Sequence, residues 1–410
     1  MKVLMFGWEF PPFSRGGLGT ACYGLTKGLT NNGVNVIFVV PRGAAEQGSH
    51  VDLIVADRLY IDNPKLKLRL INSPLFAYQS QEEYNNELKK LKQKLGPGFN
   101  EEIYGRDLFD EVEKYSEKAK IIASFEDFDI IHAHDWMTFR AGLKAKQVSN
   151  KPLVVHVHAT EFDRTGGNPN QYVYNIEREG LHAADKIIAV SNYTKNKIIN
   201  HYAIEPDKVE VVYNAIEPNK DMQIKRDIGE SEKTVLFLGR ITLQKGPDYF
   251  IEAAHRVLQF DPNVKFVVAG SGDMYGRMIN RAAELGIGHK VLFTGHLSPK
   301  EVKKAYQLAD LYVMPSVSEP FGITPLEALN NKTPVIISKQ SGVSEVLKNA
   351  LKVDFWDINE MTNKILGVLN YPSLNDTLVS EGSEEIQRFS WDTAAQTCMN
   401  IYSSLQTVGI

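Results

Sequence analysis

Two cations follow an expected strand in the second half of the chain. After the strand-like run 235–238, the sequence continues Gly239-Arg240-Ile241-Thr242-Leu243-Gln244-Lys245-Gly246. In open α/β sheets, ligands bind at the carboxyl ends of strands, which is where Arg240 and Lys245 emerge. A fork-shaped guanidinium and a point-charge ammonium together suit a diphosphate group. Taken alone, two solvated loop cations are the commoner explanation of such a pair.

Two carboxylates follow another expected strand of the second half, Leu311–Met314. The sequence there reads Glu319-Pro320-Phe321-Gly322-Ile323-Thr324-Pro325-Leu326-Glu327. Thr324 at N-cap and Glu327 at N3 predict a capping box and a helix over 325–329, so a cap is one explanation of Glu327. Glu319 and the amides of residues 321–323 lie before that helix. Carboxylates bind sugar and ribose hydroxyls, and helix-end amides bind phosphate, so the segment fits a nucleotide sugar.

A glycine pair lies near the start of the chain. Gly16 and Gly17 follow the expected strand 3–6 and precede the helical run 21–29. Adjacent glycines let backbone amides approach a ligand, and the following helix adds partial positive charge, which favours phosphate. The sequence is neither a P-loop nor a Rossmann fingerprint. A tight strand-to-helix turn without a ligand is the alternative.

Four histidines lie on two neighbouring expected strands. His132 and His134 share one strand face, and His156 and His158 have the same spacing. Such a group is one signature of a metal hydrolase. No Asp or Cys set completes a familiar ligand spacing, so we expect packing or hydrogen-bonding roles for most of them and no metal site. His158 is the exception, because a polar loop follows it.

Short β-branched runs alternate with longer amphipathic stretches along the whole chain. Many of the runs lack alternating polarity, which is typical of parallel strands buried on both faces. The pattern predicts an α/β protein with two Rossmann-like, doubly wound domains. The expected strands are 3–6, 34–40, 130–133, Leu153–Val157, 186–190 and 209–212, then 235–238, 265–269, 291–294, Leu311–Met314 and 335–337.

Three ranges follow from this pattern. We expect one domain over 1–213, a second over 214–390, and a final helix in 391–410 that packs back across the hinge. Residues 78–125 are rich in Glu and Lys and are interrupted by Gly96-Pro97-Gly98. We interpret them as a helical insertion, either a lid or a solvated helical hairpin.

Composition excludes several classes of protein. The 410 residues are 43% hydrophobic and 23% charged, as in a globular protein, and the net charge of -4 argues against nucleic acid as a partner. No apolar run is long enough for stable membrane insertion. The two cysteines, Cys22 and Cys398, form no disulfide framework, so a cytoplasmic location is expected. No feature indicates an oligomeric state.

These motifs together resemble glycosyltransferase family 4, which has the two-domain GT-B architecture. The resemblance rests on Glu319 and Glu327, on Arg240 with Lys245, and on the paired glycines. Within the family the chain is similar to glycogen and starch synthases, through His-Ala-His-Asp-Trp at 132–136 and His-Ala-Thr-Glu at 158–161.

The resemblance implies a role for each matched residue. Arg240 and Lys245 would stabilise the departing diphosphate, and Glu327 would hold the ribose. Glu319 and the backbone of residues 321–323 would hold the hexose. His158 and Asp135 would lie near the reacting carbon, with Asn214 of the hinge close by. The reaction would be a retaining glucosyl transfer from a nucleotide glucose to an α-1,4-glucan, with no cofactor and no metal.

The chain departs from ADP-glucose-using synthases at three positions. Those enzymes usually have lysine, cysteine and histidine where this chain has Arg15, Phe321 and Met137. The donor nucleotide and the acceptor therefore stay open, and another family 4 product (a disaccharide, glycolipid or envelope glycan) is the alternative. A pyridoxal-phosphate-dependent phosphorylase and a non-catalytic sugar-binding regulator are the other candidates.

Overall fold

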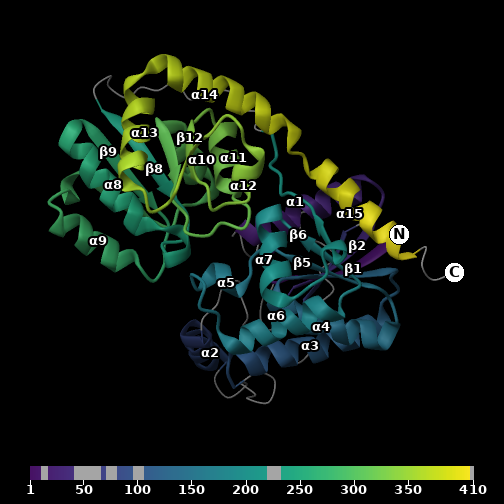
Figure 1. Cartoon of the computed structure of the whole chain (residues 1–410). Helices are drawn as coiled ribbons and strands as arrows, with labels where there is room; N and C mark the ends of the chain where they lie inside the picture. Colours follow the sequence, from purple (N-terminus) through teal and green to yellow (C-terminus); the bar gives the residue numbers. More distant parts are fainter. Residues whose placement is uncertain (11–16, 41–65, 71–80, 96–105, 219–231, 407–410) are drawn as a thin grey trace.

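The β-strands form two parallel sheets, each covered by helices (Figure 1). The computed structural model describes residues 1–10, 17–40, 66–70, 81–95, 106–218 and 232–406. The first sheet has the order β3-β2-β1-β4-β5-β6-β7, and the second has the order β10-β9-β8-β11-β12-β13. The strands are β1 (Lys2–Phe6), β2 (Asn35–Val40), β3 (Leu66–Leu70), β4 (Ile130–His134), β5 (Leu153–Val157), β6 (Lys186–Ala189), β7 (Val209–Val211), β8 (Lys233–Leu238), β9 (Val264–Ala269), β10 (Val291–Gly295), β11 (Leu311–Met314), β12 (Val335–Ser338) and β13 (Leu351–Val353).

The helices connect successive strands in both halves. Those of the first half are α1 (Gly17–Asn31), α2 (Gln81–Leu95), α3 (Leu108–Phe125), α4 (Trp136–Ser149), α5 (Glu161–Arg164), α6 (Gln171–Ala183) and α7 (Asn192–Tyr202). Those of the second half are α8 (Pro247–Phe260), α9 (Tyr275–Glu284), α10 (Pro299–Leu308), α11 (Ile323–Asn330), α12 (Val343–Val346), α13 (Ile358–Asn370), α14 (Pro372–Glu385) and α15 (Trp391–Gln406). None of these helices is both long and apolar enough to cross a membrane.

The predicted fold class is confirmed, because every strand pairing within the two sheets is parallel. All five residues of β4 and of β5 are buried, their histidines included, as expected for parallel strands covered on both faces. The sequence prediction missed β3 and β13. The first alternates leucine with Lys67 and Arg69, and the second has only three residues, so neither forms an apolar run.

The interpretation of 78–125 as an insertion or solvated hairpin is wrong for its second helix. Helix α3 packs along α4 and buries one face in the core of the first half, including Val112, Tyr115 and Ala119. It is therefore the crossover helix that leads into β4. Apart from the buried Glu111, most of its Glu and Lys side chains lie outside the buried face, and their number hid the apolar stripe in the composition.

The last helix returns to the first half of the chain. Helix α15 runs alongside α1 (Figure 1), and Trp391 and Tyr402 belong to the same core as β1. Gly24 and Gly28 permit this approach: a Cβ atom on Gly24 would lie 2.1 Å from the Trp391 ring, and one on Gly28 would lie 2.4 Å from the Trp391 carbonyl oxygen.

The connector between the sheets lies between Val211, where β7 ends, and Lys233, where β8 begins. The expected boundary at 214–225 falls partly within residues 219–231, which lie outside the described residues. The three domain ranges therefore stay predictions.

The contact of Gly28 with backbone atoms predicts an unusual response to alanine. In most helices Gly→Ala stabilises by up to about 1 kcal/mol. Gly28→Ala should instead destabilise the protein by about 1–3 kcal/mol, because α15 must move away from α1. The measurement is the midpoint of thermal unfolding. Gly276→Ala is the control, since a Cβ atom at this position of α9 meets nothing within 4 Å. Equal midpoints for both variants would contradict the packing argument.

Candidate functional site

The cation and the carboxylate predicted from two separate motifs lie in direct contact. The Lys245 ammonium is 2.5 Å from a carboxylate oxygen of Glu319, although 74 positions separate the two residues. Ser316 donates a hydrogen bond to the same oxygen over 3.3 Å. Both segments follow the carboxyl ends of adjacent strands, β8 and β11, which is the usual ligand position in such sheets.

Arg240 joins the same group through Gln244. Its guanidinium donates to the Gln244 side-chain oxygen over 3.0 Å, and the Gln244 carbonyl accepts from the Val317 amide over 2.9 Å. Gly246 makes this approach possible, since its φ is 63° and a Cβ atom would lie only 2.2 Å from the Pro315 carbonyl oxygen. The two predicted motifs therefore form one site.

The predicted capping box at Thr324 and Glu327 is wrong. Helix α11 begins at Ile323, with Gly322 as its N-cap residue and no side-chain cap. Gly322 adopts a φ of 105°, which glycine tolerates, and the chain can therefore turn into the helix before Thr324. The amides at the start of α11 have no acceptor within the helix and are available for an anionic ligand.

Glu327 and Thr324, which do not cap the helix, instead contact two buried tyrosines. The Tyr306 hydroxyl donates to the Glu327 carboxylate over 3.0 Å. Burial raises the pKa of Glu327, and the Tyr306 hydrogen bond opposes this increase. The Tyr312 hydroxyl lies 2.8 Å from the Thr324 hydroxyl oxygen. Phe321 is buried, with its ring 6.0 Å from that of Tyr213.

Asp135 and His158 form a second buried group, directly after the carboxyl ends of the neighbouring strands β4 and β5. One Asp135 oxygen accepts the His158 amide over 2.7 Å and the Ala159 amide over 3.3 Å. Asp135 has a φ of 60°, an unfavourable conformation for a residue other than glycine, and such strain is common at functional sites. Burial raises the pKa of Asp135 to about 6, although Arg164 and the two amides oppose the shift. Asp135 thus fixes the turn that carries His158.

The His158 turn and the Glu319 turn are joined across the two sheets. Asp163, five residues after His158, accepts from the hydroxyl of Ser318, next to Glu319, over 2.5 Å. The Lys197 ammonium lies 2.5 Å from Asp163 and 2.6 Å from the Ser318 oxygen. Burial alone would raise the pKa of Asp163, but these partners lower it. The carboxyl-terminal edges of the sheets therefore face each other.

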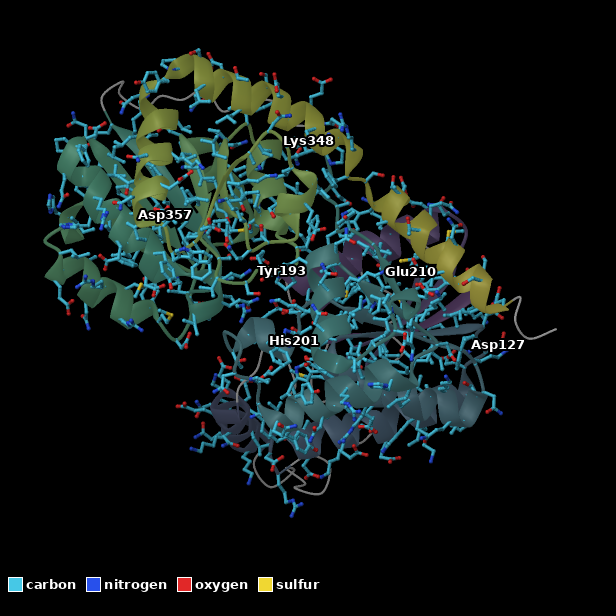
Figure 2. All side chains as sticks on the ribbon, in the orientation of Figure 1. Asp127, Tyr193, His201, Glu210, Lys348 and Asp357 are labelled. Carbon is cyan, nitrogen blue, oxygen red and sulfur yellow. The ribbon has the colours of Figure 1, made fainter. Side chains whose placement is uncertain are left out.

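The amino end of α7 adds a second connection between the sheets. Glu345 accepts the Asn192 amide over 3.0 Å and the Tyr193 amide over 2.5 Å. A carboxylate is favourable at this end of a helix. Figure 2 shows Tyr193 at the junction of the two halves, and its hydroxyl lies 3.2 Å from the Ser318 oxygen.

Only one member of the predicted glycine pair lies within the described residues. Gly16 lies outside the described residues, and Gly17 is the exposed first residue of α1. The next glycine of this turn, Gly19, donates its amide to the buried Glu9 carboxylate over 2.9 Å. One amide that could bind a phosphate is therefore already occupied. Asn214 is buried in the connector after β7.

Several of these contacts could not be found from local sequence. Asp163 and Ser318 are 155 positions apart, Lys197 is 34 from Asp163, and Tyr306 is 21 from Glu327. No residue spacing marks such pairs, because they meet only after both sheets have formed.

Comparisons with known proteins agree with this geometry. Residues 105–220 match Glycosyltransferase Family 4, and residues 219–384 match the glycosyl transferases group 1. An uncharacterized glycosyltransferase of Methanocaldococcus jannaschii is 31% identical over 98% of both chains. A glycogen synthase of Mycobacterium tuberculosis is 24% identical over 98% of this chain and 94% of its own.

The fold also matches solved structures. A sucrose-phosphate synthase from Thermosynechococcus elongatus superimposes with a TM-score of 0.77 over 100% of both chains, at 19% identity. The parallel sheets, the site between them and the family matches lead to one assignment. The chain belongs to glycosyltransferase family 4 and is a glycosyltransferase with the GT-B fold.

Proposed function

We propose that this enzyme transfers glucose, with retention, from a nucleotide glucose to the non-reducing end of an α-1,4-glucan. The observation that carries the proposal is the contact between Lys245 and Glu319, beside Arg240. It combines diphosphate-binding cations with a hydroxyl-binding carboxylate at the edge of one sheet. The likeness to a glycogen synthase along 98% of this chain supports the glucan acceptor.

The proposed chemistry is stabilisation of a leaving diphosphate. Negative charge grows on the leaving oxygen as the sugar–oxygen bond breaks, and fixed cations aimed at that oxygen lower the barrier. Arg240 and Lys245 supply this charge, so the reaction needs no divalent ion at the diphosphate. Added Mg²⁺ or Mn²⁺ should therefore leave the rate unchanged.

Retention is proposed to occur by front-face substitution, without a covalent sugar–enzyme intermediate. One oxygen of Asp135 is already bound by two amides, and Glu319 is paired with Lys245. The incoming hydroxyl then gives its proton to the departing diphosphate on the same face of the sugar. Trapping of a sugar ester on either carboxylate would overturn this mechanism.

Another family 4 product remains the second candidate. The donor site would be the same, and only the acceptor would change to a sugar phosphate, a lipid or an envelope glycan. A regulator without turnover would use the same contacts to bind a sugar nucleotide.

The proposed reaction is tested by a product assay, in which UDP-, ADP- and GDP-glucose are each offered with glycogen, maltooligosaccharides and sugar phosphates. Elongated α-1,4-glucan is the expected product. Arg240→Ala and Glu319→Ala should each lower kcat about 100- to 1000-fold, because each removes a group that acts on the reacting donor. Arg178→Ala, which removes an exposed arginine of α6, is the control and should keep full activity. Near-normal turnover in both site variants would remove the assignment.

A variant of Tyr306 separates binding of the donor, measured by KM, from the chemical step, measured by kcat. Tyr306→Phe leaves the Glu327 carboxylate without its hydroxyl partner, and a hydrogen bond to a charged group contributes about 1.5–3 kcal/mol. We expect KM for the nucleotide sugar to rise about ten- to a hundredfold, with little change in kcat, because the ribose is remote from the breaking bond. Tyr371→Phe, at an exposed tyrosine, is the matched control. A fall in kcat at constant KM would be inconsistent with a ribose-binding role for Glu327.

A further inference from the structure

A cluster of four imidazoles lies inside the first half of the molecule. His132 and His134 on β4 pack against His156 on β5 and His158 just after it, with neighbouring ring centroids 4.2–5.3 Å apart. The first three are at most 2% exposed. The site proposed for sugar transfer uses only His158.

The cluster contains buried nitrogen atoms without a partner among the described residues. The Nδ1 atom of His132 lies 2.6 Å from the Tyr402 hydroxyl, and the Nδ1 atom of His134 lies 3.0 Å from Nε2 of His158. The Nε2 atoms of His132 and His134 and both ring nitrogens of His156 have no partner. A buried ring nitrogen that nothing binds destabilises the folded protein. Several together indicate a missing group.

Three of the histidines place ring nitrogens close enough together to share one metal ion. One ligand atom from each of His132, His134 and His156 lies within 4.8 Å of the other two. In two of these rings Nδ1 is held by a neighbour while Nε2 is left open, which is how metal-binding histidines are usually oriented.

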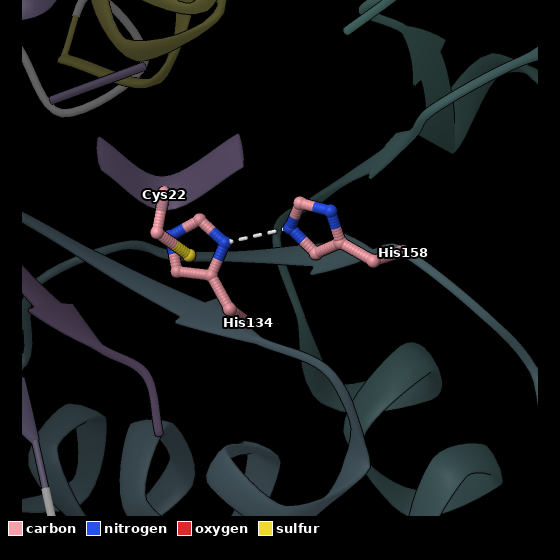
Figure 3. A group of neighbouring side chains, drawn as sticks. All are labelled: Cys22, His134 and His158. Atoms are coloured by element: carbon pink, nitrogen blue, oxygen red, sulfur yellow. Dashed lines mark hydrogen bonds between the residues drawn. The ribbon is translucent and has the colours of Figure 1, made fainter. Parts of the chain in front are cut away.

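A second set shares His134 but fits a metal less well. Cys22 lies near His134 and His158 (Figure 3), so a cysteine adjoins the histidines in space although no sequence spacing marks it. However, these two histidines already bind each other. Burial, with Glu9 and Asp135, also raises the pKa of the Cys22 thiol, which disfavours the thiolate that a metal needs.

We propose that His132, His134 and His156 bind one zinc-class divalent ion. Three imidazoles form a known type of zinc site, in which water takes the fourth position. The ion would hold the His134 ring, and through its hydrogen bond to His158 it would orient a residue of the site described above. The inference replaces the sequence-based expectation of no metal site, but it does not require that the enzyme act on any particular sugar.

The test is cobalt binding by the full chain after removal of bound metal with a chelator. One equivalent of Co²⁺ should give the visible ligand-field bands of a low-coordinate site, and one equivalent of Zn²⁺ should abolish them. Zn²⁺ should also raise the midpoint of thermal unfolding. His156→Gln should lose both effects, whereas His289→Gln, at an exposed histidine, should keep them.

A second variant keeps the test decisive if His156→Gln does not fold. Tyr402→Phe removes the partner of His132 Nδ1 and should weaken Co²⁺ binding about 10- to 100-fold. The proposal is overturned if the parent protein gives no Co²⁺ spectrum and no thermal shift, which would leave water as the occupant. It is equally overturned if a thiolate charge-transfer band appears and is lost in Cys22→Ser, which would assign the ion to the other set.

Discussion

The Asp163 carboxylate is fully buried where the turns of the two sheets meet, and a charge in that position requires partners. Lys197 and Ser318 supply them from one side, and the Thr160 amide and hydroxyl supply them from the other, over 2.8 and 2.7 Å. Loss of one member of a buried ion pair typically costs about 3–5 kcal/mol. This small polar group therefore helps to fix the relative position of the two sheets, together with the Glu345 contacts at the amino end of α7, because Ser318 belongs to the second half.

The position of the sheets in turn decides which groups can act together. Asp163 follows the turn that carries His158, and Ser318 precedes Glu319. A shift at their contact would therefore separate His158 from Glu319. Lys245 and Arg240 depend on it less, because hydrogen bonds within the second half hold them to the same turn. The proposed donor site is thus a local feature of one half, while the complete proposed site needs both halves.

The parts of this arrangement that could be predicted from sequence are those with a local pattern. Apolar runs located most strands, and the ends of β8 and β11 located Arg240, Lys245 and Glu319, since ligand sites follow the carboxyl ends of parallel strands. The capping prediction failed because Gly322, with its positive φ, begins α11 before Thr324. Helix α3 was misjudged because its charged residues outnumber the apolar ones that it buries. Tyr306 and Cys22 meet their partners only through tertiary packing, which no spacing encodes.

Helix α15 has a consequence for how the chain is made. Residues 391–402 complete the core around β1, which precedes the other described strands in the chain. The nascent amino-terminal half therefore exposes the Gly24 and Gly28 face of α1 while the whole carboxyl-terminal half is translated. Domains generally fold as they emerge from the ribosome, but here the earlier half must wait for residues that emerge after the later one. The order of folding is thus expected to run against the order of synthesis.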